Sequence, residues 1–280
     1  MIRLLNAGLT YNAGNLYEKK VLSDINLEIG DNETVGIIGE SGCGKTSLIK
    51  LINALLLPTQ GRVLVDGLDA KADKRALAEI RKKVGVLFQL SEEQVFEESV
   101  FREVAFGLSS GAADSADVRK KVSASLEMAG VKDAAILDRN PFTLSSGMLK
   151  KIAIASIIAY DPMIYIFDEP TTGLDRAGRD AFWEIIKVLK EKKRTLLIIS
   201  HNMDDIYLHT ERLLVLEKGR LLEDGPTPEV FETLSTRKDF CENVPDALRL
   251  RHYVRDNFKI SWDGKSVREL AALLSGRVGI

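Results

Sequence analysis

The most informative stretch of the sequence is a glycine-rich octapeptide, GESGCGKT, at residues 39–46. It matches the pattern G-x-x-x-x-G-K-[ST] and lies between an apolar run, ETVGIIG, and a helical pattern, GKTSLIKLINALL. This strand–loop–helix context is what a phosphate-binding loop requires. Its glycines let backbone N–H groups curl around phosphate oxygens, and the helix N-terminus adds positive potential. The sequence therefore predicts a nucleotide site.

Two side chains of this loop have roles of their own. Lys45 can reach the β and γ phosphates of a nucleoside triphosphate, and the Thr46 hydroxyl can bind Mg²⁺. Cys43 is a small loop residue whose side chain has no role in the cradle. A glycine-rich turn with a chance lysine is the alternative, but the flanking strand and helix argue against it. The expected phosphate-binding residues are Gly39, Glu40, Ser41, Gly42, Cys43, Gly44, Lys45, Thr46 and Ser47.

A pair of carboxylates follows the apolar strand pattern in MIYIFDEP. Asp168 suits coordination of Mg²⁺, and Glu169 is placed to orient and polarise a water molecule against the γ phosphate. Such a pair can instead cap the next helix. However, Pro170 and TTGLD follow, which leaves the pair at the carboxyl end of the strand, where α/β sheets bind ligands.

His201 directly follows another strand pattern, TLLIIS. A lone histidine is commonly structural, but one at a strand end can hydrogen-bond a γ phosphate or the attacking water. We therefore expect Lys45, Glu169 and His201 to be catalytic, with Thr46 and Asp168 as metal ligands.

Short apolar runs that end in Gly, Asp or Ser alternate with helical patterns along the chain. This alternation indicates an α/β fold with βαβ units and a mainly parallel sheet covered on both faces. RLLVLEKGRLLEDG predicts two strands joined at a Lys218-Gly219 turn. The pattern GRDAFWEIIKVLKEKKR predicts a helix with one apolar face, made of Phe182, Ile185, Ile186 and Leu189.

The sheet pattern is interrupted once and then stops. Residues from about 91 to 144 lack clear strands, and DALRLRHYVRDNFK and SVRELAALLS near the C-terminus are typical of added helices. We predict an α/β domain over residues 1–228, a helical subdomain inserted at about 91–160, and a C-terminal helical extension over 229–280.

The bulk composition restricts the setting. Of 280 residues 45% are hydrophobic, and the formal net charge is −2, so a large core is expected and a nucleic-acid partner is not. Cys43 and Cys241 are far apart, which predicts no disulfide framework and a reducing, cytosolic setting. No stretch has the length and apolarity of a membrane span or a signal peptide. If the chain works at a membrane, another subunit must cross it.

With these motifs in order, residues from about 1 to 230 resemble the ATPase subunit of ABC transporters, a P-loop NTPase whose sheet core is preceded by antiparallel strands. The resemblance implies that Tyr11 stacks on adenine. It implies that Gln89, which ends VGVLFQ, touches Mg²⁺ and reports nucleotide state to a membrane partner. It also implies that TTGLD, ending in Asp175, crosses a dimer interface.

LSSGM, at residues 144–148, falls where the family has its signature, Leu-Ser-Gly-Gly-Gln. By resemblance, two subunits sandwich two ATP molecules, and Ser145 and Gly147 contact the γ phosphate held by the partner. Ser146 replaces a glycine and would be strained if the turn needs positive φ there. Met148 replaces a glutamine and cannot supply an amide's hydrogen bonds.

Two explanations of these two substitutions remain open. They represent either tolerated drift in a working homodimer, or one weakened site in a heterodimer whose other chain has a normal signature. The otherwise complete catalytic set of this chain favours the heterodimer.

A narrower resemblance lies in SEEQVFEESVFREVAFG, which is similar to the corresponding stretch of energy-coupling factor (ECF) ATPases, most closely over residues 94–98. These drive uptake of vitamins and of cobalt or nickel ions. In that family the stretch borders the groove that receives coupling helices of the transmembrane T component; the alternative is a surface of solvated glutamates. The resemblance implies ATP and Mg²⁺ as cofactors, a T component and a substrate-binding S component as partners, dimer contacts from the tail, and a peripheral place on the cytoplasmic side of the cell membrane.

Three other functions compete with this interpretation. The acidic stretch argues against the ATPase of another type of ABC transporter. A soluble ABC protein of translation, repair or cluster assembly often has two fused ATPase halves or long coiled insertions, and this chain has one half. A regulatory module that does not hydrolyse ATP would be expected to lack Glu169 or His201, and both are present.

Overall fold

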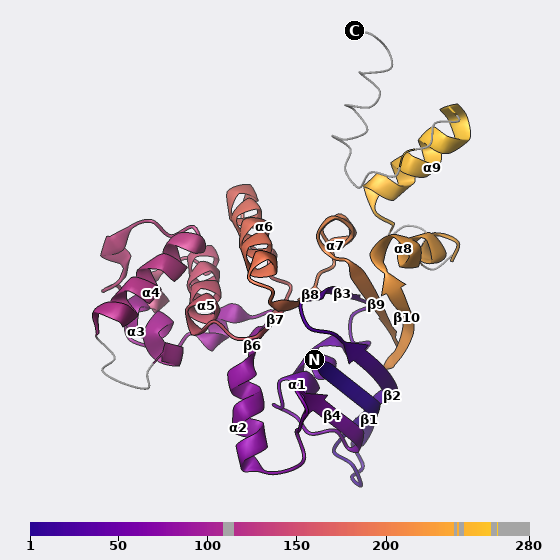
Figure 1. Cartoon of the computed structure of the whole chain (residues 1–280), viewed down its shortest axis with the longest axis horizontal. Coiled ribbons are helices and arrows are strands. Elements are labelled where there is room, and N and C mark those ends of the chain that lie inside the picture. Colours follow the sequence, from indigo (N-terminus) through magenta and orange to yellow (C-terminus); the bar gives the residue numbers. More distant parts are fainter. Residues whose placement is uncertain (109–114, 238–239, 241–243, 259–261, 263–280) are drawn as a thin grey trace.

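The computed structural model describes residues 1–108, 115–237, 240, 244–258 and 262. The centre of this described part is a six-stranded sheet with the strand order β10-β9-β3-β8-β7-β6 (Figure 1). All neighbouring strands are parallel except β10, which returns antiparallel to β9. The mainly parallel sheet is therefore confirmed. The strands are β3 (Thr34–Ile38), β6 (Val84–Leu87), β7 (Ile164–Asp168), β8 (Thr195–Ile199), β9 (Arg212–Glu217) and β10 (Arg220–Pro226).

A second, antiparallel sheet contains the N-terminal strands, in the order β2-β1-β4-β5. It confirms the antiparallel strands that the family resemblance implied. The end of β1 pairs with the start of β2, where Tyr11 is opposite Lys19. The strands are β1 (Ile2–Tyr11), β2 (Lys19–Ile29), β4 (Gln60–Val65) and β5 (Leu68–Asp69).

The central strands are buried on both faces, as expected for a covered parallel sheet. Side chains alternate between two cores, so that Leu197 packs with the N-terminal sheet and α1 (Lys45–Ile52), whereas Ile198 packs with the helices of the opposite face. On that opposite face, α6 (Arg176–Glu191) buries the four apolar residues that the sequence placed on one side of a helix. The two cores hold the carboxyl ends of the parallel strands in fixed positions.

Helices and short 3-10 turns fill the chain between β6 and β7, and the described residues there contain no strand, as predicted. They gather on one side of the sheet, where α3 and α4 pack on α5 (Figure 1). These elements are η1 (Ser91–Gln94), α3 (Val100–Ala105), η2 (Phe106–Leu108), α4 (Ala116–Met128), η3 (Ala134–Ile136), η4 (Pro141–Thr143) and α5 (Ser146–Tyr160). Along the chain, α2 (Lys74–Lys83) directly precedes β6.

After β8 and α7 (Met203–His209), the chain forms the predicted β9–β10 hairpin and then α8 (Thr227–Ser235) and α9 (Asp246–Phe258). Lys218 and Gly219 turn the hairpin with positive φ angles of 47° and 78°. His252 Nε2 of α9 and Glu232 Oε2 of α8 are hydrogen-bonded at 2.8 Å, which connects the two helices. The helix predicted at SVRELAALLS lies outside the described residues, as does Cys241.

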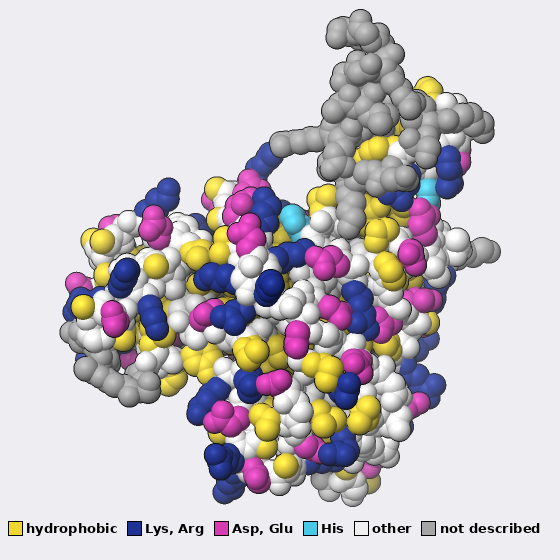
Figure 2. Space-filling view, in the orientation of Figure 1, with side chains coloured by type: hydrophobic (Ala, Val, Ile, Leu, Met, Phe, Trp, Pro, Cys, Tyr) yellow, Lys and Arg dark blue, Asp and Glu magenta, His cyan; other side chains and the backbone are white. Residues whose placement is uncertain are grey.

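Basic and acidic side chains are interspersed over the face shown in Figure 2, in keeping with the small net charge. Within the described ranges, no helix combines the length and the apolar character needed to cross a bilayer.

Candidate functional site

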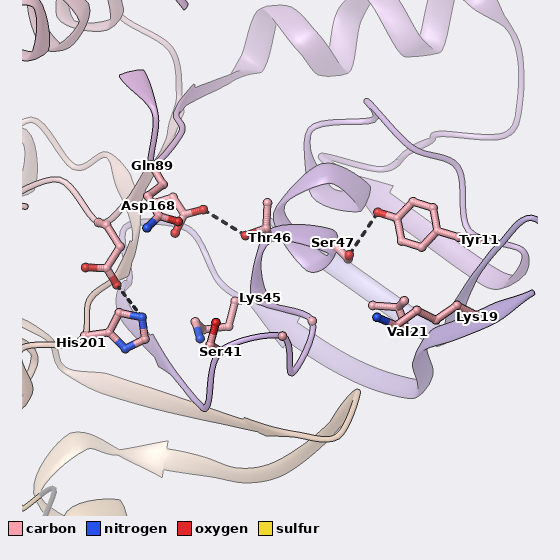
Figure 3. A pocket seen from close by; sticks show the side chains of 13 residues that line it. Tyr11, Lys19, Val21, Ser41, Lys45, Thr46, Ser47, Gln89, Asp168 and His201 are labelled. Carbon is pink, nitrogen blue, oxygen red and sulfur yellow. Dashed lines mark hydrogen bonds and ion pairs between the residues drawn. The ribbon is translucent and has the colours of Figure 1, made fainter. Parts of the chain in front are cut away.

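A pocket of about 300 Å³ lies where β3, β6, β7 and β8 end (Figure 3). It brings together most of the residues that the sequence singled out, from five separate parts of the chain. Two of the lining residues, Lys19 and Val21, were not predicted. They belong to β2 and reach the pocket through the pairing of β1 with β2, which no sequence motif marks. The predicted residues that line the pocket are Tyr11, Ser41, Gly42, Gly44, Lys45, Thr46, Ser47, Gln89, Asp168, Glu169 and His201.

The phosphate loop connects β3 to α1 with glycines in conformations that other residues rarely adopt. Gly39 has φ of 150° and Gly44, at the start of α1, has φ of 115°. A Cβ atom on Gly39 would lie 2.2 Å from the Leu216 carbonyl oxygen, so only glycine fits. The ammonium of Lys45 folds back over the loop and donates to the carbonyls of Gly39 at 2.6 Å and Glu40 at 3.0 Å. These contacts keep a positive charge at the centre of the cradle.

Cys43 is buried within this loop. Its carbonyl oxygen accepts a 2.9 Å hydrogen bond from the N–H of Gly219, and the carbonyl of Gly219 accepts one from the N–H of Ser23 at 2.9 Å. The turn of the β9–β10 hairpin therefore braces the phosphate loop against β2.

A site suited to a cation lies between the loop and β7. The Thr46 hydroxyl donates to Asp168 Oδ2 at 3.2 Å, and Gln89 lines the same space. Burial raises the pKa of the Asp168 carboxyl above its ordinary value, and the hydrogen bond from Thr46 opposes that shift. A bound cation would stabilise the ionised form. The described residues contain no group of three or more His, Cys, Asp and Glu side chains that could hold a metal ion by themselves. One carboxylate with hydroxyl and amide oxygens fits Mg²⁺, which keeps water and phosphate ligands.

Glu169 has an unusual backbone conformation, with φ of 53°. For a residue with a side chain, this left-handed conformation costs on the order of 1 kcal/mol. Its N–H donates to the Ile199 carbonyl at 3.0 Å, and its Oε2 accepts a 3.2 Å hydrogen bond from the Thr172 hydroxyl. Its other carboxylate oxygen, Oε1, is buried and has no hydrogen-bond partner among the described residues.

His201 approaches this same oxygen, with Nε2 3.6 Å from Glu169 Oε1. Thr172 was missed by sequence reasoning, because a threonine three residues after a strand gives no signal of its own. An unpartnered buried acceptor costs free energy unless a ligand or water satisfies it. Oε1 is therefore an acceptor whose hydrogen-bonding capacity the described residues leave unused.

Tyr11 lies at the other end of the pocket, at the end of β1 (Figure 3). Its hydroxyl and the Ser47 hydroxyl are 3.2 Å apart. The pocket thus has an aromatic ring at one end, the phosphate loop in the middle and carboxylates at the far end. This order fits an extended nucleoside triphosphate.

The signature turn and Asp175 do not line this pocket. Ser145 caps the N-terminus of α5, where its hydroxyl accepts from the Met148 N–H at 3.4 Å. Asp175 caps α6 in the same way, accepting from the Gly178 N–H at 2.8 Å. Ser145, Ser146 and the nearby α5 N-terminus face solvent, as a contact with another subunit would require.

The condition under which Ser146 would be strained is not met. Ser146 is the first residue of α5 and is not among the residues with positive φ. Any residue with a side chain can adopt this helical conformation. The serine therefore occupies the turn without the backbone strain that a left-handed glycine position would impose.

A second cavity, of about 440 Å³, adjoins the nucleotide pocket and shares Thr46, Gln89 and Asp168 with it. Its rim includes Leu55 and Leu90, whose side chains are 49% and 59% exposed. This cavity is named the Gln89 groove below.

The predicted 94–98 run begins at the Gln89 groove and is held there by two anchors. Gln94 lines the groove and is tied to β6, since it accepts from the Phe88 N–H at 2.9 Å and donates to the Val86 carbonyl at 3.2 Å. The buried carboxylate of Glu103 then accepts from the N–H groups of Phe96 and Glu97, both at 3.0 Å.

The fold and the pocket together define a P-loop nucleotide-binding protein of the ABC cassette type. A family model described as ABC transporter matches residues 22–172. The energy-coupling factor transporter ATP-binding protein EcfA2 of Clostridioides difficile is 38% identical over 262 residues, which are 92% of this chain and 91% of that protein. EcfA2 of Symbiobacterium thermophilum is 38% identical over 274 residues, with 96% and 95% covered.

Solved structures agree with these sequence relatives. The ATP-binding cassette MJ0796, in a dimeric post-hydrolysis state bound to ADP and Pi, has a TM-score of 0.74 and 28% identity, and the match covers 81% of this chain and 99% of that one. CbiO1 of Clostridium perfringens, part of the ABC transporter complex cbiONQ, has a TM-score of 0.70 and 27% identity, with 85% and 95% covered. The chain belongs to the ABC transporter family and, within it, to the energy-coupling factor ATP-binding proteins.

Proposed function

We propose that this chain is the ATP-hydrolysing subunit of an ECF transporter and that it powers the uptake of a vitamin or a transition-metal ion. The observation that carries the proposal is the buried Oε1 of Glu169 at the end of the nucleotide pocket, which has no hydrogen-bond partner in the described part of the chain. Such an oxygen can accept a hydrogen bond from the attacking water and take its proton. A module that only binds nucleotide has no need of it.

The rest of the pocket binds and orients the nucleotide. Tyr11 stacks on adenine, the loop N–H groups hold the phosphates, and the Lys45 ammonium interacts with the β and γ oxygens. Thr46, Asp168 and Gln89 would hold Mg²⁺, which would supply charge neutralisation at the phosphates. His201 donates a hydrogen bond to the γ phosphate or to the water beside Glu169.

The chain works as part of a dimer, a state supported by the dimeric cassette among its structural neighbours. The exposed N-terminus of α5, with Ser145 and Gly147, contacts the γ phosphate held by the partner, and the loop ending in Asp175 lies at the interface. ATP stabilises the closed dimer and hydrolysis removes this bridge, so that the subunits separate. The otherwise complete catalytic set of this chain, beside the changed signature, favours a heterodimer over a homodimer.

The Gln89 groove is the proposed docking site for a short amphipathic helix of the transmembrane T component. Its apolar rim fits such a helix. The groove shares Thr46, Gln89 and Asp168 with the nucleotide pocket. ATP in the pocket and a helix in the groove therefore contact the same three residues. A separate S component binds the transported substrate, and the chain lies at the cytoplasmic side of the membrane.

The domain division remains part of the proposal. Residues 1–228 form the ATPase domain with the helical subdomain at about 91–160, and residues 229–280 form an extension that adds dimer contacts. The order of elements supports a change close to this boundary, because β10 ends at Pro226, α8 begins at Thr227 and α9 follows; residues 259–261 and 263–280 lie outside the described part of the chain.

Purification of the tagged chain from native membranes in mild detergent tests the proposal. An integral-membrane partner and a second ATPase subunit should come with it, and the complex should release phosphate from ATP. Recovery from the cytosol alone, without a membrane partner, would overturn the ECF assignment.

A further inference from the structure

Lys150 is a buried lysine that no part of the proposed mechanism uses. It lies in the second turn of α5, five residues after Ser145, and its side chain is only 4% exposed. A buried ammonium is costly unless its N–H groups are satisfied by acceptors. Its contacts therefore indicate why a charge is kept at this point of the helix.

The Lys150 ammonium donates to two main-chain carbonyl oxygens of one turn after β7. It lies 2.8 Å from the carbonyl oxygen of Glu169 and 2.7 Å from that of Thr172. The turn is also closed from within, because the Thr172 N–H donates to the Glu169 carbonyl at 3.4 Å. Lys150 thus joins α5 to both ends of the turn at residues 169–172.

This turn fixes the conformation of the catalytic candidate. The peptide groups on either side of Glu169 are both held, its N–H by Ile199 of β8 and its carbonyl by Lys150. Within the turn, the Thr172 hydroxyl holds Glu169 Oε2. Without the ammonium, the left-handed backbone of Glu169 would lose the contact that opposes its relaxation, and the direction of Oε1 would change with it.

The helix that carries Lys150 also begins at the signature turn. A Cβ atom on Gly147 would lie 3.7 Å from the Gly173 carbonyl oxygen, so the start of α5 also lies close to the loop that follows residues 169–172. The helix α5 therefore carries both the signature residues proposed to face a partner subunit and the lysine that holds the turn at residues 169–172.

We propose that Lys150 is a positioning residue for ATP hydrolysis. It holds the turn at residues 169–172, and with it the Glu169 carboxylate, at a fixed place relative to α5. The inference rests on the proposed function of Glu169 and adds to it a residue that does not touch the nucleotide. ATP itself contacts the phosphate loop, so Lys150 acts on turnover and not on ATP binding.

The test replaces Lys150 with methionine in the full chain, in whatever dimer or complex it is purified. Methionine keeps the unbranched apolar stem and fills irregular space well, but it donates no hydrogen bond. We expect kcat to fall roughly tenfold to a hundredfold, as for a displaced catalytic group, while the KM for ATP stays within about twofold of the wild type. Lys150→Arg should regain most of the rate, because its guanidinium can still donate to both carbonyls.

Lys151→Met is the matched control, since it removes a charge from the next residue of the same helix, and it should leave kcat unchanged. If Lys150→Met does not fold, Lys150→Gln keeps one donor group and should give an intermediate loss. A kcat for a folded Lys150 variant equal to that of Lys151→Met would overturn the inference.

Backbone hydrogen exchange gives a second readout that needs no turnover. The amides of Glu169, Thr171 and Thr172 should exchange faster in Lys150→Met than in Lys151→Met, whereas those of the phosphate loop should not change. Equal exchange at 169–172 would overturn the positioning role. A wild-type chain without ATPase activity would instead count against the proposed function, and the exchange measurement would still decide the role of Lys150.

Discussion

His201 and Glu169 meet at the end of the nucleotide pocket, with 3.6 Å between Nε2 and Oε1, and they differ sharply in exposure. The histidine side chain is 58% exposed, whereas that of the glutamate is 6% exposed. The carboxylate is held by its turn, and the ring has room to adjust to a ligand. This difference supports the proposal that Glu169 accepts the proton and that His201 makes an orienting contact.

The first prediction concerns Glu169→Gln. The amide keeps the size and the contact with Thr172 but is a far weaker base, so turnover should slow by roughly two to four orders of magnitude while ATP binding is retained. The variant should accumulate as an ATP-bound dimer, which gel filtration with radiolabelled ATP measures. Lys45→Ala is the contrasting variant, because it should weaken ATP binding itself. Hydrolysis at the wild-type rate by Glu169→Gln would remove this assignment.

The second prediction separates the contribution of the Tyr11 ring to ATP binding from that of its hydroxyl group. Tyr11→Ala removes the ring and should weaken ATP binding by roughly 1–3 kcal/mol, the range for a base stacked on an aromatic side chain. Tyr11→Phe keeps the ring and loses only the contact with Ser47, so its effect should be much smaller. Titration with a fluorescent ATP analogue gives both affinities. Equal losses in the two variants would show that the hydroxyl, and not stacking, is what matters.

The third prediction tests the run at residues 94–98. Reversing Glu97 and Glu98 to lysine should reduce assembly with the membrane partner or the ATPase rate coupled to it. ATP affinity of the isolated subunit should not change. Stability should change little, because the ion pair of Glu98 with Arg102 is exposed and such pairs contribute about 1 kcal/mol or less.

The control for this prediction reverses Glu184 and Glu191 together, two exposed glutamates of α6 that lie outside the 94–98 run. Co-purification yield in mild detergent is the measurement. Equal yields for the two double variants would show that the 94–98 run is an ordinary solvated surface.

The fourth prediction concerns the signature turn. The purified chain alone should hydrolyse ATP slowly, and Ser146→Gly with Met148→Gln should raise its rate severalfold. Because Ser146 is unstrained in the first turn of α5, the gain should come from Met148→Gln alone. Ser146→Gly by itself should add nothing and should cost up to about 1 kcal/mol of helix stability. If the unmodified chain hydrolyses ATP fast and cooperatively, and the double change does not alter that rate, then Ser146 and Met148 are tolerated drift in a homodimer.

Local patterns were sufficient to predict much of this fold. The α6 helix shows why, since the spacing of Phe182, Ile185, Ile186 and Leu189 already determines which side of it is buried. The phosphate loop and the Asp168–Glu169 pair could be predicted for a similar reason. Their chemistry depends on residues that are adjacent in sequence, at the end of a strand.

Other features depend on parts of the chain that are far apart in sequence. The placement of Lys19 in the pocket follows from strand pairing, and the burial of Lys150 follows from the packing of α5 on the turn after β7. The helical conformation of Ser146 could not be read from the family spelling, because a glycine in a motif does not reveal whether its φ is positive.

The position of β3 has a consequence for how the protein is made. The strand before the phosphate loop is bordered by β8 and β9, and the loop is braced by Gly219 in the turn that follows β9. A ribosome delivers β3 and the loop long before these partners. We expect nascent chains that end before Arg212 to bind no ATP, which retention of stalled ribosome complexes on an ATP resin would measure. ATP binding then begins only when nearly the whole ATPase domain has emerged, so a half-made subunit cannot form a sandwich with a finished one.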